Sequence, residues 1–265
     1  MATLKISSPQ NQHIKHIVAL QQKSQLRREE NLVVVEGFRE LQHCSNAGHT
    51  LKQVYYCPTM INAEQLPANS DAQVIEVTRE VYEKIAYRGS TEGIIALVEP
   101  RHYSLSDIAL GDSPLIAVLE SVEKPGNIGA VLRSADAAHA TAVVVCDPLT
   151  DLYNPNLIRS SLGAIFTVPC VACDSHECIK FLKDNNIQIL TAQLQDSKPY
   201  YDTDMRSATA IVMGTESTGL TSAWRQAADA HIRIPMGGSL DSLNVSVSAA
   251  ILLFEAVRQR QQHVE

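Results

Sequence analysis

Short apolar runs alternate with amphipathic stretches along the first hundred residues of this 265-residue chain. Ile14, Ile17 and Val18 recur at helical spacing, so we expect a helix over 11–22. A second helical stretch passes through Phe38 and Leu41. Unbroken apolar runs of strand type lie at 32–35, 54–56, 74–77 and 94–98. This pattern predicts a compact α/β unit of modest size.

The alternation becomes regular after Pro114. Strand-type apolar runs lie at 115–119, 142–145, 187–190, 209–213 and 231–234. Helical segments between these runs lie at 128–140, 156–162, 177–185 and 222–228. Such an alternation is typical of a mainly parallel sheet with helices on both faces. We therefore predict an α/β fold for the second half as well.

The two halves are joined by a segment with the composition of a linker. Residues 99–113, EPRHYSLSDIALGDS, are rich in Pro, Ser, Asp and Gly. We expect a first domain over 1–100, a linker over 101–113 and a second domain over 114–265.

Charge is unevenly distributed along the chain. The formal net charge of −7 disfavours a nucleic-acid partner for the chain as a whole. Positive side chains nevertheless outnumber carboxylates in 1–39, where Arg27 and Arg28 are adjacent. Phosphate affinity follows local charge, so this pair is a candidate for phosphate contacts. A solvated helix face is the simpler explanation for the arginine pair taken alone.

Neither a membrane span nor a secretory signal is expected. No apolar run is long enough to cross a bilayer, and the first residues lead into a polar stretch. The six cysteines fit a cytoplasmic protein, where thiols stay reduced. The run Cys170, Cys173, His176 and Cys178 raises the question of zinc. It lacks the usual second ligand pair far along the chain, so we predict no metal.

Polar, glycine-containing segments follow three of the predicted strands, at 120–127, 214–219 and 235–244. In parallel sheets, ligands bind where the strands end at their carboxyl edge. Asn127 and Gly129 open a helix after the first of these strands, and Arg133 follows in the same helix. The stretch Gly126-Asn127-Ile128-Gly129 matches neither the dinucleotide fingerprint nor the P-loop spacing, which disfavours nucleotide-dependent chemistry of either kind.

The stretch SLDSLNVSVSAAILLFE, at 239–255, begins with polar side chains and continues as an apolar helix pattern. Ser242 and Asn244 fit helix capping, because their oxygens accept hydrogen bonds from a first turn. The same groups also fit a ligand site at a helix N-terminus. The local pattern leaves both interpretations open.

Three motifs together resemble one family. These are Asn127-x-Gly129-x-x-x-Arg133, Gly214-x-Glu216-x-x-Gly219-Leu220 and Ile234-Pro-Met236 with Ser242-Leu-Asn244-Val-Ser. In this order they resemble the SpoU/TrmH family of SPOUT-class RNA 2′-O-ribose methyltransferases. The N-terminal segment resembles the L30e-like RNA-binding domain of the ribosomal RNA branch. NLVVVEGFREL and EKPGNIGAVLRSADAA are similar to the thiostrepton-resistance methyltransferases of that branch.

The resemblance implies a fold, a cofactor and a set of site residues. It implies a SPOUT α/β fold with a deep C-terminal trefoil knot that binds S-adenosylmethionine, and a homodimer. The cofactor-binding positions it implies are Gly214, Ile234 and Leu243, with Met236 and Val245 as apolar neighbours. The catalytic set it implies is Arg133, Asn127, Glu216, Ser242 and Asn244. Arg27, Arg28 and Arg159 are the candidate RNA contacts.

The resemblance also raises a mechanistic choice at Arg133. A guanidinium is a poor general base because its pKa exceeds about 12. We favour an electrostatic role, in which Arg133 stabilises charge that develops on the ribose oxygen.

Methylation of a ribose 2′-hydroxyl in 23S ribosomal RNA is the function that we expect. Transfer RNA methylation within the same family and non-catalytic RNA binding on the same scaffold are the alternatives.

Overall fold

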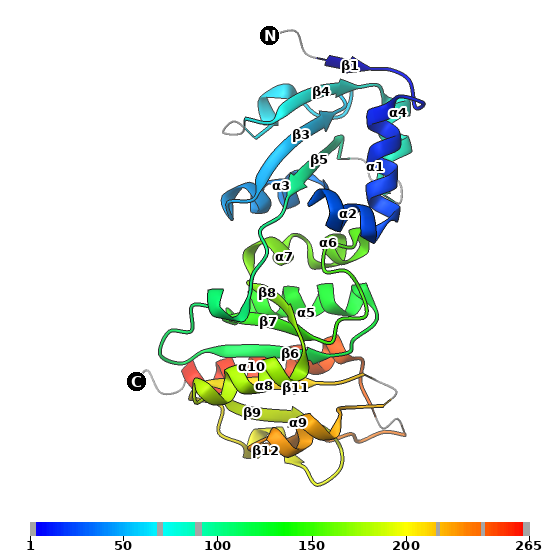
Figure 1. The fold of residues 1–265 in the computed structure, drawn as a ribbon. Helices are drawn as coiled ribbons and strands as arrows, with labels where there is room; N and C mark the ends of the chain where they lie inside the picture. The colour runs from blue at the N-terminus through cyan, green and yellow to red at the C-terminus, as the bar shows by residue number, and fades with distance from the viewer. Residues whose placement is uncertain (1–3, 68–70, 88–91, 216–217, 240–241, 262–265) are drawn as a thin grey trace. The chain divides into compact units, whose positions relative to one another are not determined.

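The computed structural model describes residues 4–67, 71–87, 92–215, 218–239 and 242–261 (Figure 1). The chain divides into two compact units. The first comprises Met1–Arg101 with Tyr153–Thr167, and the second comprises His102–Leu152 with Val168–Glu265.

The first unit contains a mixed five-stranded sheet in the order β1-β4-β3-β5-β2. Strand β5 is antiparallel to both of its neighbours, β2 and β3, whereas β4 is parallel to β1 and β3. The strand bounds are β1 Leu4–Ile6, β2 Val33–Glu36, β3 Thr50–Tyr56, β4 Gln73–Val77 and β5 Ile94–Glu99. The sheet confirms the α/β character predicted for this half.

Helices cover this sheet and bury the apolar positions that the sequence spaced at helical intervals. Ile14, Ile17 and Leu20 of α1 are fully buried in one apolar cluster with Tyr55 and Tyr82. The helix bounds are α1 Gln12–Gln22, α2 Ser24–Glu30, α3 Phe38–Asn46 and α4 Arg79–Ile85, with a 3₁₀ turn η1 at Ala63–Gln65.

Two short helices from the middle of the sequence belong to the first unit. These are α6 (Pro155–Ser161), which packs against β2, and α7 (Ala164–Thr167), which packs against α3. The buried Phe166 ring meets His49 edge-on, with the ring centres 5.0 Å apart. The sequence-based division assigned 153–167 to the second domain because it follows chain order, whereas this apolar ring is covered by the first unit.

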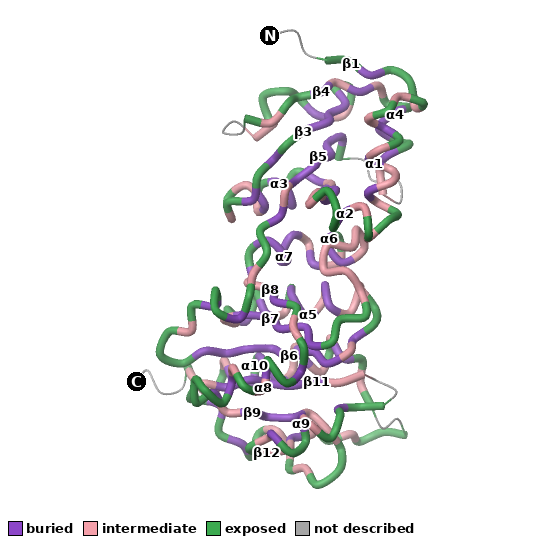
Figure 2. The backbone as a smooth tube through the Cα atoms, viewed as in Figure 1, coloured by how far each residue is buried: buried purple, intermediate pink, exposed green. Residues whose placement is uncertain are grey.

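The second unit contains a seven-stranded sheet in the order β10-β12-β9-β11-β6-β7-β8, and every pairing is parallel. The strand bounds are β6 Leu115–Glu120, β7 Ala142–Cys146, β8 Cys170–Cys173, β9 Gln188–Ala192, β10 Lys198–Pro199, β11 Thr209–Met213 and β12 Ala230–Arg233. All residues of β6, β7 and β11 are buried (Figure 2). Burial on both faces explains their near-continuous apolar sequences.

Helices lie on both faces of this parallel sheet. Helix α10 packs against α5 and against β6 and β11, whereas α8 packs against α9 and the other face. The bounds are α5 Pro125–Ala137, α8 Ser175–Asp184, α9 Ser222–Ala227 and α10 Val245–Gln261, with 3₁₀ turns η3 at Leu105–Asp107 and η4 at Tyr200–Asp202. Among the described residues, no helix is long and apolar enough to cross a membrane.

The segment predicted as a linker is largely packed against the second unit. Leu105 and Ile108 are buried in its core cluster, and Tyr103 forms a parallel bridge with Val171 of β8. The polar composition of the segment predicts a linker, and two buried apolar residues in so short a stretch do not establish a helix or strand.

Arg27 has a structural position that the sequence did not suggest. The side chain is only 5% exposed, and its Nη1 donates to the carbonyls of Leu20 (2.5 Å) and Gln21 (3.3 Å) at the end of α1. These carbonyls lack partners within their own helix, so the guanidinium caps them. Arg27 is therefore corrected from a candidate phosphate contact to a helix-capping residue, whereas Arg28 is exposed.

We expect Arg27→Ala to lower the free energy of unfolding by about 1–3 kcal/mol, because buried hydrogen bonds from a charged donor are lost. Arg28→Ala is the matched control and should change it by less than about 0.5 kcal/mol. Urea denaturation followed by circular dichroism measures both. Equal stability of the two variants would show that the Arg27 cap contributes nothing.

Candidate functional site

A cavity of about 420 Å³ lies in the second unit, where β9, β11 and β12 end. Its volume falls in the usual range for small-molecule sites, about 300–1,000 Å³. The wall is formed by residues that follow these strands and by the start of α10. They include Gln193–Gln195, Met213–Thr215, Thr218–Leu220, Arg233, Ile234, Met236, Ser242, Leu243 and Val245. The cavity occupies the edge of the parallel sheet where ligands are expected.

All the residues predicted to bind a cofactor lie around this one cavity, together with Ser242 from the predicted catalytic set. The five cofactor positions are Gly214, Ile234, Met236, Leu243 and Val245. They come from three segments of the chain that the fold brings together at one edge of the sheet.

The loop after β11 forms a compact wall of backbone. A Cβ at Gly214 would overlap the carbonyl of Gly219, so glycine is needed for this close approach. Gly219 N donates to the Thr215 carbonyl (3.1 Å), and the Thr215 and Thr218 hydroxyls are 2.7 Å apart. Glu216, predicted in the catalytic set, lies outside the described residues.

A buried carboxylate anchors the far end of this loop. Glu120, the last residue of β6, is 2% exposed and accepts hydrogen bonds from Thr221 N (2.9 Å) and Thr221 Oγ1 (2.7 Å). A buried carboxylate is costly unless it is hydrogen-bonded, and here the two bonds fix the loop to the end of β6. Glu120 was not among the predicted site residues, although an acidic residue directly after an apolar predicted strand is a usable signal.

The start of α10 settles the question of capping. Asn244 Oδ1 accepts hydrogen bonds from Ser246 N (3.0 Å) and Ser246 Oγ (2.6 Å), so Asn244 caps the helix. Its Nδ2 also donates to Oδ1 of Asn127 in α5, at 3.2 Å. Ser242 and Leu243, just before the cap, line the cavity. Capping and a position at the site are therefore compatible.

Arg133 lies on α5 and is exposed. It follows Asn127 by six positions, which corresponds to about 9 Å along a helix axis. The side chain is not part of the cavity wall and makes no hydrogen bond or ion pair within the described part of the chain.

Arg159, a candidate RNA contact, belongs to the first unit. Its Nη1 donates to the Tyr87 carbonyl (2.7 Å), and its guanidinium lies 6.0 Å from the centre of the Tyr87 ring. The residue is exposed overall.

Several polar side chains of the cavity were not predicted, among them Gln193, Gln195, Arg225 and Arg233. Arg225 Nη1 lies 3.4 Å from Gln195 Oε1, and Arg233 donates to the Ser197 carbonyl. Gln193 and Gln195 come soon after the strand predicted at 187–190, just as the other site segments follow strands. That position was the signal that could have identified them.

Two family models match the chain, one in each half. The SpoU rRNA Methylase family matches residues 114–254. The MRM3-like substrate binding domain matches residues 11–96.

Curated relatives match over most of the chain. The 23S rRNA (guanosine-2′-O-)-methyltransferase RlmB of Salmonella typhi is 40% identical over 175 residues, which is 64% of this chain and 72% of that protein. The protein of the same name from Vibrio vulnificus is 37% identical over 191 residues, 70% of this chain and 77% of that protein.

Solved structures agree with the whole fold. The crystal structure of an RNA 2′-O ribose methyltransferase superposes with a TM-score of 0.86 at 37% identity, over 97% of this chain and 100% of that chain. The AdoMet-bound rRNA methyltransferase from Sinorhizobium meliloti gives a TM-score of 0.89 at 26% identity, over 99% of each chain. The family match across the second unit, the relatives and these structures agree, and the chain belongs to the SpoU rRNA methylase family.

Proposed function

We propose that this protein transfers a methyl group from S-adenosylmethionine to a ribose 2′-hydroxyl of 23S ribosomal RNA, with guanosine as the modified nucleoside. The observation that carries the proposal is one cavity lined by the second and third sequence motifs, in a chain of the SpoU family. The first motif reaches this region through the Asn127–Asn244 hydrogen bond. The relatives named for guanosine 2′-O-methylation of 23S rRNA support the choice of substrate.

The cavity suits S-adenosylmethionine in size and chemistry. Leu220, Ile234 and Leu243 offer apolar surface for an adenine ring, and the backbone at Gly214 and Thr215 offers hydrogen-bonding groups. The cofactor supplies a methyl group on a positively charged sulfur. Gln193 and Gln195 add amide groups that can hydrogen-bond to the polar parts of such a ligand.

The chain's own residues would align the ribose and stabilise charge. The Asn127–Asn244 hydrogen bond holds the start of α5 against the start of α10, beside Ser242 at the cavity wall. We propose that Asn127, Ser242 and Asn244 position the ribose, and that Arg133 stays protonated. Its charge would stabilise the negative charge that develops on the attacking oxygen. Glu216 remains part of the proposed set.

Ribosomal RNA is favoured over transfer RNA by the substrate-binding domain that occupies residues 11–96. Within the first unit, Arg28 and Arg159 are exposed cations that we propose as phosphate contacts. A non-catalytic RNA binder is disfavoured because binding alone needs no Asn127, Arg133, Ser242 and Asn244 set. The proposed site of action is the cytoplasm, where ribosomal RNA is found.

We further propose a homodimer and a trefoil-knotted C-terminal region. Helix α10 carries Val247 and Phe254, each 46% exposed, with the half-buried Ile251 between them. Positions i, i+4 and i+7 lie on one helical face, so these side chains form an apolar stripe. Such a stripe suits a second copy of the chain, in keeping with the pairing expected from the family resemblance.

Leu243→Arg should abolish S-adenosylmethionine binding, because a cation would enter the apolar part of the cavity next to a cationic ligand. Isothermal calorimetry measures the affinity, and we expect a loss of at least about a hundredfold. Leu149→Arg is the control, since Leu149 is 61% exposed and lies outside the cavity wall. Unchanged affinity in Leu243→Arg would show that the cofactor does not bind in this cavity.

Arg133→Ala should lower the methylation rate by about a hundred- to a thousandfold, as expected for the loss of one preorganised electrostatic donor. Cofactor affinity should stay near wild type, because Arg133 is not part of the cavity wall. Single-turnover methylation of ribosomal RNA measures the rate.

Arg133→Lys distinguishes the two roles of Arg133. Lysine keeps the charge but deprotonates far more readily than arginine and lacks its planar fork. A general base would be rescued by lysine increasingly as pH rises. The electrostatic role gives poor rescue with little pH dependence, and wild-type rates in Arg133→Ala would exclude both.

Phe254→Glu should shift the protein from dimer to monomer, because a carboxylate would be buried without a partner in the proposed interface. Light scattering at micromolar concentration measures the mass. Leu149→Glu is the control, because Leu149 is exposed and lies in the segment that follows β7. A monomeric wild type would end the dimer proposal.

A further inference from the structure

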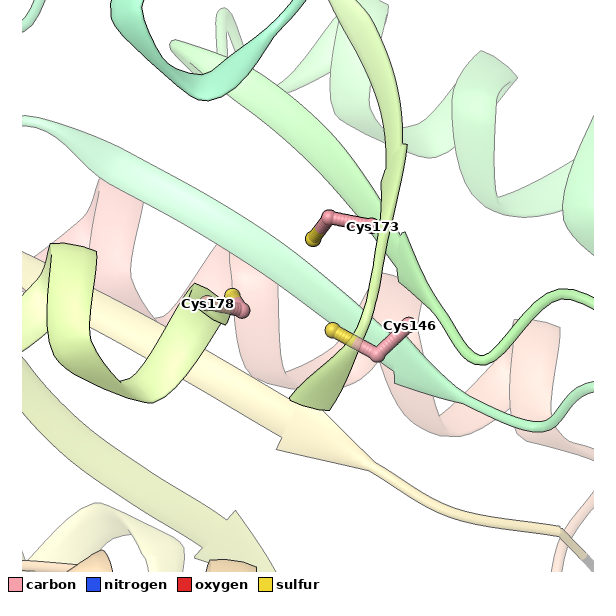
Figure 3. A group of neighbouring side chains, drawn as sticks. All are labelled: Cys146, Cys173 and Cys178. Carbon is pink, nitrogen blue, oxygen red and sulfur yellow. The ribbon is translucent and has the colours of Figure 1, made fainter. Parts of the chain in front are cut away.

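Three cysteines from separate segments converge in the second unit (Figure 3). Cys146 ends β7, Cys173 ends β8 and Cys178 lies in α8, and their sulfur atoms all lie within 4.8 Å of one another. Cys146 and Cys178 are fully buried, whereas Cys173 is partly exposed. None of the three lines the cavity described above.

The fold itself produces this convergence. Cys146 and Cys173 are paired partners in adjacent parallel strands, so their side chains leave the same face of the sheet. Asp174 then caps α8, with its Oδ1 accepting from Glu177 N (2.8 Å), and the first turn carries Cys178 over that face. Cys170, part of the cysteine run noticed in the sequence, is outside the group. Cys146 adds a third cysteine from a distant part of the sequence, which the cysteine run alone does not provide.

The spacing suits a small thiophilic ion. Zinc binds thiolate at about 2.3 Å, which places three sulfurs around one ion about 4 Å apart. The sulfur–sulfur distances in this structure, at most 4.8 Å, would need to shorten by less than about 1 Å to reach that arrangement. The nearby carboxylates of Asp147 and Asp174, which act on Cys173 through their charge, make the surroundings favourable to a cation.

We propose that Cys146, Cys173 and Cys178 form a three-thiolate binding site for Zn²⁺, with water as the fourth ligand on the partly exposed side of Cys173. Each thiol releases its proton to solvent as its sulfur binds the ion. Inert packing of small apolar thiols is the competing explanation, since buried cysteines commonly pack in this way.

The role of the ion follows from the neighbouring hydrogen bonds. Asp147 accepts from Ser175 Oγ (2.6 Å), and Ser175 Oγ accepts from Trp224 Nε1 (2.9 Å). Ser175 is the first residue of α8, and Trp224 lies in α9. Both helices pack on this face of the sheet. Zinc would therefore tie β7, β8 and α8 together and stabilise the second unit without taking part in methyl transfer.

The test uses the full chain, reduced with a phosphine, incubated with Zn²⁺ alone and dialysed. Metal analysis should give one zinc per wild-type chain, lost in Cys173→Ala. Cys170→Ala is the matched control: Cys170 lies on the same strand but outside the group, and this variant should retain zinc. Zinc should also raise the melting temperature of wild type and of Cys170→Ala, but not that of Cys173→Ala.

Cobalt substitution identifies the ligands independently of any variant. Thiolate-to-cobalt charge-transfer bands in the wild-type spectrum are expected. Their absence, a wild type without zinc, or equal zinc in wild type and a folded Cys173→Ala would each overturn the proposal. If Cys173→Ala does not fold, the wild-type metal content and cobalt spectrum decide.

Discussion

The in-register parallel pairing of β11 with β6 and β9 is the constraint on which the site depends. Met213 lies opposite Leu119 on one side and Ala192 on the other, so these three strands end at one level. Their following segments must then share one edge, and the cavity forms there. Parallel pairing requires crossover connections, and helices supply most of them. The ligand site is thus a consequence of strand register before any side chain is considered.

Glu120 fixes Thr221, which follows the cavity-lining residue Leu220, to the end of β6. A carboxylate buried at the end of β6 needs hydrogen bonds, and Thr221 supplies two of them from the far end of the β11 loop. Gly214 fixes the near end, because no side chain fits against Gly219. Gly214 and Thr221 are thus both fixed next to the cavity, one by close backbone packing and the other by hydrogen bonds.

Periodicity was sufficient to predict the central strands, because residues such as Val118 and Val144 are buried on both faces and form unbroken apolar runs. It was insufficient where tertiary packing decides: Phe166 joins the first unit, and Arg27 caps a helix instead of facing solvent. The positions that the motif resemblance assigns to the cofactor, Gly214, Ile234 and Leu243, lie around one cavity. It could not reveal Glu120 or the approach of Cys146 to Cys173, since both depend on which strands are neighbours.

Arg133 is exposed to solvent and lies outside the cavity wall. An exposed guanidinium interacts weakly with other charges, because water screens it. Its electrostatic effect grows when a bound substrate excludes that water. The Asn127–Asn244 hydrogen bond already fixes the helix that carries Arg133, so little reorganisation of the backbone is required. In the proposed role of Arg133, bound RNA would therefore strengthen the stabilisation of charge on the ribose oxygen, and the protein alone would provide the arrangement of the residues.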